Sequence, residues 1–102
     1  MRAGGGGRGG GRRSDIRLKH DIILLGSFDN GLGFYRFMYN GSDKVFVGVM
    51  AQEVQKVVPE AVVRGSDGYL KVLYEKLGLK LQTYQQWIAL GGQIPATGPT
   101  QE

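Results

Sequence analysis

The sequence contains no cysteine and a single histidine, His20, among its 102 residues. Without cysteine the chain can form neither a disulfide framework nor a thiolate metal site, and one imidazole is too few for a histidine-based metal centre. We therefore expect no metal and no cofactor. No apolar run approaches the roughly 20 residues needed to cross a bilayer, and the first residues lack the apolar segment of a secretory signal. These absences predict no membrane partner and leave the cellular compartment undefined.

The chain also lacks a basic folded surface, although its formal net charge is +4. The four arginines before Ser14 carry the whole excess, because nine basic residues from Ser14 onward face nine acidic ones. A phosphate backbone is bound by a continuous basic surface, so we do not expect nucleic acid to be a partner of the folded part. The Arg-Gly steps of residues 1–13 resemble RNA-binding segments but have no aromatic residue for stacking. RNA binding through this tail remains open as a separate hypothesis for the function of the protein.

Two segments poor in apolar side chains frame the part of the chain that can fold. Residues 1–13, MRAGGGGRGGGRR, are mostly glycine and arginine, so burial could not offset the entropy lost on ordering them. Residues 91–102 consist largely of Gly, Pro, Thr and Gln. The sequence therefore predicts a disordered Gly/Arg-rich tail over 1–13, one domain over 14–90 and a disordered C-terminal tail over 91–102.

Hydrophobic patterning and turn signals predict an α+β domain with small antiparallel β-hairpins and one short helix. Aromatic and β-branched segments joined by NGSDK indicate one hairpin, and segments joined by RGSDG indicate a shorter one. The apolar residues of 51–58 recur on one face of a short helix, which Pro59 ends. The strands are expected at 16–24, 34–39, 45–50, 61–63 and 69–72.

The last apolar pattern has the spacing of a coiled-coil seam. Alternating steps of three and four residues separate five apolar positions, which predicts a C-terminal amphipathic helix able to form a coiled coil. These positions are Tyr74, Leu77, Leu81, Tyr84 and Ile88. The seam spans only about two heptads, fewer than the three or four that identify a coiled coil. A helix lying on its own sheet is the other interpretation of the same periodicity.

Ser14 and Lys19 lie five residues apart where the tail meets the domain. A Ser-Asp pair at such a junction is typically a turn or a cap, and a lysine is typically solvated. A serine hydroxyl becomes a nucleophile when a base takes its proton, and lysine is such a base only when it is neutral. Burial against the sheet, or positive charge from Arg17, could lower the pKa of Lys19 enough. The residues alone leave both interpretations open.

His20 and Asp21 suggest a Ser/His/Asp triad as a competing arrangement. In an extended strand Lys19 and His20 point to opposite faces, so a geometry that brings Lys19 to Ser14 carries His20 away. The triad is therefore the weaker hypothesis. FDNGLG and GSDG lack the ligand spacing of a calcium loop and are interpreted as turns. Four scattered carboxylates are interpreted as solvated surface groups: Asp29, Glu53, Glu60 and Asp67.

Three separated motifs follow one another along the chain: SDIRLKHDI, GVMAQEVQKVVPEAV and DGYLKVLYEKL. Together they resemble the C-terminal intramolecular chaperone domain of phage endosialidases, tailspikes and tail fibres, which also occurs in the myelin regulatory factor family. The resemblance covers about Ser14 to Trp87. It implies a homotrimer that helps an upstream β-rich fibre reach its threefold register and then releases itself by autoproteolysis. It implies no small-molecule substrate, and it favours a cytoplasmic or virion-associated location.

The resemblance assigns roles to individual residues of this chain. Ser14 matches the nucleophile and Lys19 the base of a single-turnover, self-cleaving serine endopeptidase, and the scissile bond lies between Arg13 and Ser14. Backbone amides would stabilise the oxyanion. Asp15 and Leu18 match residues that accompany the pair. A further group matches the central helix and the entry to the last helix and is interpreted as scaffold: Gln52, Glu53, Pro59, Glu60, Tyr69, Val72 and Tyr74.

The resemblance also suggests why cleavage would wait for assembly. If helices of three subunits had to associate before Lys19 lost its water, Lys19 would become neutral only in the trimer. Only thirteen residues precede Ser14 in this sequence, and they contain no fibre segment for the domain to assist. A non-catalytic trimerisation module, or a remnant of a fibre protein, is therefore the alternative to an active self-cleaving domain.

Overall fold

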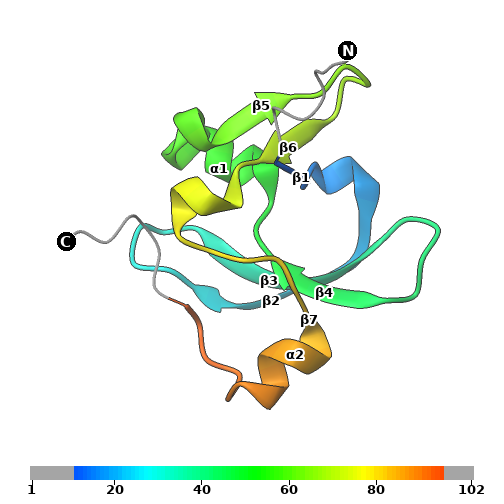
Figure 1. Cartoon of the computed structure of the whole chain (residues 1–102), viewed down its shortest axis with the longest axis vertical. Helices are drawn as coiled ribbons and strands as arrows, with labels where there is room; N and C mark the ends of the chain where they lie inside the picture. The colour runs from blue at the N-terminus through cyan, green and yellow to red at the C-terminus, as the bar shows by residue number, and fades with distance from the viewer. Residues whose placement is uncertain (1–10, 96–102) are drawn as a thin grey trace, which may run out of the picture.

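The computed structural model describes residues 11–95, which form two antiparallel sheets with two short α-helices. Figure 1 shows the three-stranded sheet, in the order β1-β6-β5, at one end with α1, and the four-stranded sheet, β2-β3-β4-β7, at the other end with α2. The predicted α+β class is confirmed. The strands are β1 Arg12–Arg13, β2 Lys19–Ser27, β3 Gly33–Tyr39, β4 Val45–Gly48, β5 Val62–Arg64, β6 Leu70–Val72 and β7 Gln82–Thr83. The α-helices are α1 Ala51–Val57 and α2 Tyr84–Ala89, and 3-10 helices occupy η1 Ile16–Leu18, η2 Pro59–Ala61 and η3 Tyr74–Leu77.

Both predicted hairpins are present. The pair β3 and β4 places Phe37 opposite Phe46, and the pair β5 and β6 places Val63 opposite Lys71. The predicted short helix is α1, which ends just before Pro59 because proline begins the next 3-10 turn instead. FDNGLG and GSDG lie in the connections between strands, as the turn interpretation requires.

The predicted first strand begins later than the sequence indicated. Residues 16–18 form the 3-10 helix η1, because the Asp15 side chain accepts a hydrogen bond from the Arg17 backbone and caps a turn there. The strand β2 starts at Lys19, which is paired with Tyr39 of β3. That register places Lys19, one of the two candidate catalytic residues, opposite the aromatic ring of Tyr39.

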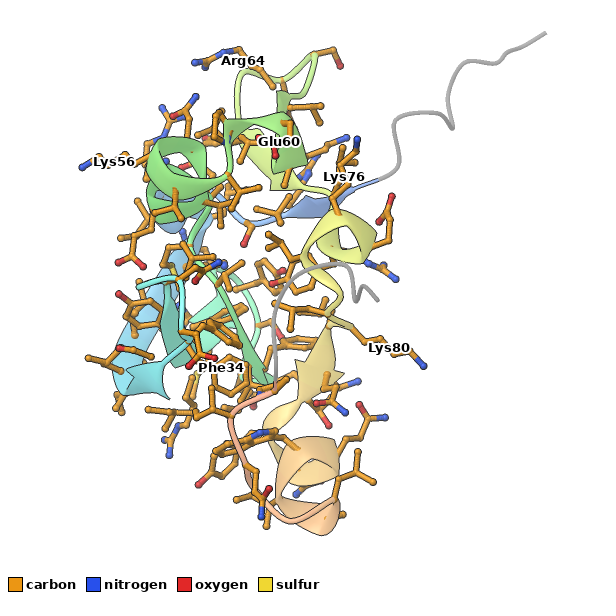
Figure 2. The ribbon with its side chains drawn as sticks, turned by 90° about the vertical axis from the view of Figure 1, so that its left-hand side faces the viewer. Phe34, Lys56, Glu60, Arg64, Lys76 and Lys80 are labelled. Atoms are coloured by element: carbon orange, nitrogen blue, oxygen red, sulfur yellow. The ribbon has the colours of Figure 1, made fainter. Side chains whose placement is uncertain are left out.

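The core lies between the sheets and under the helices. Residues of β3 and β4, such as Phe37 and Val47, are 0% and 1% exposed, and Val54 of α1 is 0% exposed. Trp87 of α2 packs on Phe34 with their ring centroids 5.4 Å apart. Figure 2 shows Phe34 inside the molecule. The buried side chains of these elements form one apolar core, to which β1 and η1 contribute no buried residue.

The predicted helix from Tyr74 to Ile88 is wrong, and no coiled coil is present among residues 11–95. The 3-10 helix η3 ends at Gly78, whose positive φ of 71° breaks the helical path. The chain then forms β7, and α2 begins where Thr83 and Gln86 form a capping box. Four of the five apolar positions contact the chain's own core, as the alternative interpretation had it, but from two separate pieces, and the fifth, Ile88, is 51% exposed. No helix within residues 11–95 is long and apolar enough to span a membrane.

Parts of the two predicted tails are ordered. Arg12 and Arg13 form β1, which pairs with β6. The backbone of β1 is ordered by this pairing, although neither residue has an apolar side chain to bury. At the other end, the Gln93 carbonyl accepts a 2.8 Å hydrogen bond from the Trp87 indole, and Ile94 packs against the core. The rest of the predicted tails, 1–10 and 96–102, lies outside the described residues.

Gly48 provides a test of the packing between β4 and η3. A Cβ atom on Gly48 would overlap the Tyr74 hydroxyl and lie 3.4 Å from the Phe37 ring. Because all three residues are buried, we expect Gly48→Ala to lower the free energy of unfolding by about 1–3 kcal/mol. Urea denaturation followed by fluorescence of the single tryptophan measures the change.

Tyr74→Phe removes the atom that the new methyl group would meet. Gly48→Ala should therefore cost much less stability in the Tyr74→Phe background than in the wild-type chain. An equal loss in the two backgrounds would contradict this account of the packing.

Candidate active site

Three polar residues are buried where the two sheets meet. Ser14 follows β1 and Lys19 begins β2, and Ser14, Asp15 and Lys19 are 0%, 0% and 6% exposed. Buried charged groups are rare unless they are paired, so such a group needs a specific explanation. The interpretation of Lys19 as an ordinary solvated lysine is wrong. Figure 2 shows the usual situation at Lys56, Lys76 and Lys80, whose side chains extend away from the ribbon.

The main chain around Ser14 is held by both neighbouring elements. Its N–H donates to the Leu70 carbonyl of β6 at 3.1 Å, and its carbonyl accepts from the Ala51 N–H of α1 at 2.8 Å. The Ser14 hydroxyl donates to the Val49 carbonyl at 2.6 Å. The position of the hydroxyl oxygen is therefore set by Val49, which directly follows β4, together with α1 and β6.

The Lys19 amine approaches the same two oxygen atoms. Its Nζ lies 2.8 Å from the Ser14 Oγ and 2.8 Å from the Val49 carbonyl oxygen. It also lies 3.8 Å from the centroid of the Phe37 ring. The structure thus brings together the two residues that the sequence singled out as a possible catalytic pair.

Burial lowers the pKa of Lys19 to about 7, and the charge of Asp15 opposes that shift only in part. A substantial fraction of Lys19 is therefore neutral near neutral pH. The single chain achieves this burial with its own residues. The expectation that Lys19 loses its water only when three subunits associate is accordingly wrong.

The Asp15 carboxylate is buried but has hydrogen-bond donors at both oxygens. Its Oδ1 accepts from the Arg17 backbone and Nε, each at 2.9 Å, and from Gln52 Nε2 at 2.8 Å. Its Oδ2 accepts from Arg17 Nη2 at 2.8 Å and from the Leu70 N–H at 3.0 Å. The Arg17 guanidinium above all holds the pKa of Asp15 well below its usual range, against the effect of burial. Asp15 is thus a charged anchor beside Ser14, and its side chain caps the 3-10 helix η1.

The peptide bond before Ser14 also has specific partners. The Arg13 carbonyl accepts a 2.8 Å hydrogen bond from the Tyr39 hydroxyl, and the Arg13 guanidinium pairs with Asp67 at 2.7 Å. A cavity of about 320 Å³ opens beside this bond and is lined by Arg13, Leu18, Tyr39 and Asn40. Sequence reasoning missed Tyr39 as a site residue, because only the pairing of β2 with β3 brings it there.

The competing triad is not assembled. His20 Nδ1 is 3.1 Å from the Asn40 side-chain oxygen and His20 Nε2 is 3.9 Å from Asp21, and neither residue contacts Ser14. The interpretation of Glu53 as merely solvated is wrong, since Glu53 accepts a hydrogen bond from the hydroxyl of Tyr35 on β3. Asp67 is exposed, as the sequence predicted, and pairs with the Arg13 guanidinium at the surface. In residues 11–95 there is no group of three or more His, Cys, Asp or Glu side chains placed to hold a metal ion.

The geometry is that of an activated hydroxyl. A serine oxygen within hydrogen-bond reach of a buried amine, whose pKa is near neutral, can lose its proton to that amine and attack a carbonyl carbon. One candidate is the carbonyl of the peptide bond that Ser14 makes with Arg13, because its carbon is bonded to the Ser14 nitrogen.

Residues 14–63, about half of the chain, match the model of a peptidase family described as "Chaperone of endosialidase". The matched segment begins at Ser14, contains Lys19, and runs through β2, β3, β4 and α1 into β5. The resemblance seen in the sequence motifs is confirmed over this range, and the third motif lies beyond it. Comparison with curated proteins and with solved structures gave no significant match.

The lowered pKa of Lys19 predicts how stability depends on pH. Between about pH 7 and about pH 9.5 the unfolded chain keeps the Lys19 proton that the folded chain loses, so the free energy of unfolding should rise with pH by up to about 1.4 kcal/mol per unit. Urea denaturation at a series of pH values measures this slope, with all chains carrying Ser14→Ala so that no reaction of the Ser14 hydroxyl affects the result.

Lys19→Met should flatten the pH dependence, because it removes the buried amine that titrates. Lys80→Met is the matched control, since Lys80 is exposed and should leave the slope unchanged. The same slope in the Lys19→Met chain would show that Lys19 is not the group with the lowered pKa.

Proposed function

This chain carries a chaperone-of-endosialidase domain over residues 14–63, and on that premise we propose that it cuts its own main chain once, between Arg13 and Ser14. Ser14 is the nucleophile and Lys19 the general base. The observation that supports this best is the 2.8 Å distance between the buried Lys19 Nζ and the Ser14 Oγ. At that distance a neutral amine can take the hydroxyl proton directly.

The attacking oxygen and the leaving nitrogen belong to the same residue. As Lys19 takes the hydroxyl proton, Ser14 Oγ bonds to the Arg13 carbonyl carbon and closes a five-membered ring through the Ser14 Cβ, Cα and N. The C–N bond then breaks, and Lys19 returns its proton to the Ser14 nitrogen. The product is an ester between the Arg13 carbonyl and Ser14 Oγ. Water hydrolyses the ester and leaves a carboxylate on Arg13 and an amino group on Ser14.

The resting contacts suit this sequence of steps. The Ser14 hydroxyl proton points at the Val49 carbonyl at 2.6 Å, while Lys19 Nζ lies 2.8 Å from the same hydroxyl oxygen. A rotation about the Cβ–Oγ bond would turn the proton to Lys19 and leave the oxygen in place. The Ser14 N–H, bonded to the Leu70 carbonyl at 3.1 Å, keeps the leaving nitrogen oriented.

We extend the proposal to assembly, in which the domain forms a homotrimer and aligns an upstream fibre segment. Membership of the chaperone family supports this role. Large apolar side chains are also exposed on the single chain: Ile23 and Leu24 of the edge strand β2 are 47% and 58% exposed, and Leu90 after α2 is 76% exposed. Exposed apolar groups of this kind are commonly covered by association. A trimer without cleavage remains the alternative function.

Intact mass spectrometry of the purified chain tests the cleavage. We expect a species that begins at Ser14 in the wild-type chain, and only the uncut chain in Ser14→Ala and in Lys19→Met. Ser27→Ala and Lys80→Met replace exposed residues of the same types and should cut as the wild type does. A folded wild-type trimer that stays uncut would support the non-catalytic alternative, and a chain that sediments only as a monomer at high concentration would contradict the assembly role.

The cleavage rate should rise with pH to a plateau, with its midpoint near pH 7, because only neutral Lys19 accepts the proton. The rate can be followed by mass spectrometry after uncut chain is diluted from denaturant into buffers of different pH. A rate that falls through this range would be inconsistent with Lys19 as the base.

A further inference from the structure

We propose that Tyr39 is a third catalytic residue, whose phenol donates a hydrogen bond to the Arg13 carbonyl oxygen as that oxygen becomes an oxyanion. The inference rests on the proposed cleavage between Arg13 and Ser14 and adds the group that stabilises its negative charge. Tyr39 Oη lies 2.8 Å from the Arg13 oxygen, within the range at which such donors act. The sequence alone had suggested only backbone amides for this task.

The pairing of β1 with β6 directs the Arg13 carbonyl toward Tyr39. The Ser14 N–H donates to Leu70 of β6, so the position before it, Arg13 opposite Lys71, is a non-hydrogen-bonded pair of this antiparallel ladder. At such a position the carbonyl points away from the partner strand. The Arg13 oxygen is therefore available to a donor from the other sheet.

The pairing of β2 with β3 delivers that donor. Lys19 and Tyr39 are opposite one another in the ladder, so the base and the phenol are set by the same rung. The Tyr39 ring is held edge-on against Phe37 and Phe46, with centroid distances of 5.3 Å and 5.4 Å. Lys19 Nζ lies over the Phe37 ring as well. The Phe37 ring thus contacts both Lys19, the base, and Tyr39, the oxyanion donor, and helps to position them.

The phenol remains a donor where the base is active. Burial raises the pKa of Tyr39 above its usual value, so it keeps its proton through the range in which Lys19 becomes neutral. A donor already in place needs no reorganisation during the reaction, and its hydrogen bond strengthens when the oxygen acquires charge. Tyr39 therefore favours the tetrahedral intermediate over the uncut peptide.

Tyr39→Phe tests the proposal, because it removes the hydroxyl and keeps the ring that packs on Phe37. We expect the single-turnover rate to fall by about 10²–10³-fold, with the midpoint of the pH profile unchanged since Lys19 keeps its surroundings. Tyr35→Phe is the matched control. It removes a hydroxyl from the same strand, but this hydroxyl binds Glu53 and does not contact the scissile bond. The Tyr35→Phe chain should therefore be cut at the wild-type rate.

A second variant separates catalysis from a structural role of the hydroxyl. A ring-fluorinated tyrosine placed at position 39 has a more acidic phenol, which is a stronger donor, and should cut faster than the wild type below the pH at which it ionises. A rate insensitive to phenol acidity, or wild-type cleavage in Tyr39→Phe, would overturn the role of Tyr39 and leave the Ser14–Lys19 proposal standing. A wild-type chain that is never cut would overturn both.

Discussion

The buried carboxylate of Asp15 is the interaction on which the rest of the site depends. A charge without water must have its oxygens filled by donors, and here the donors come from three parts of the chain: Arg17 of the 3-10 helix, Gln52 of α1 and Leu70 of β6. Moving any of these segments would leave part of a buried charge unpaired, at a cost of several kcal/mol. The residue next to Asp15 in the chain is Ser14. Because its donors fix Asp15, the adjacent Ser14 and its hydroxyl are held in place as well.

Asp15 and Lys19 show how partners and burial together decide the charge state of an ionisable group. Both are almost fully excluded from water. Asp15 has donors at both oxygens and stays charged, whereas Lys19 is offered only the Ser14 hydroxyl, the Val49 carbonyl and an aromatic face, so its pKa falls to about 7. Asp15 is thus a charged anchor, whereas a substantial fraction of the more deeply buried Lys19 is neutral near neutral pH.

The site exists only where the two sheets meet. The strand that would be cut is held by β6 of the smaller sheet, while Lys19 and Tyr39 face each other on β2 and β3 of the larger one. A chain in which these sheets had not docked would have the hydroxyl without its base. Cleavage at this site would therefore report that the domain has folded. The desolvation of Lys19 occurs within one chain and does not involve the exposed apolar groups of β2 and α2.

The sequence by itself determined the features that rest on short-range chemistry: the hairpin of β3 and β4, the end of α1 before Pro59, and the five-residue spacing of Ser14 and Lys19 within a recognisable family motif. It misjudged residues 74–88, because apolar residues of two separate pieces, most of which face their own core, have the same spacing as one continuous helical seam, although Gly78 and Thr83 carried local signals of the break. Only the tertiary structure decided that Lys19 is buried, that Asp67 meets Arg13 and that Tyr39 reaches the Arg13 carbonyl. Burial and strand register bring together residues far apart in the chain, and no local pattern encodes which of them will meet.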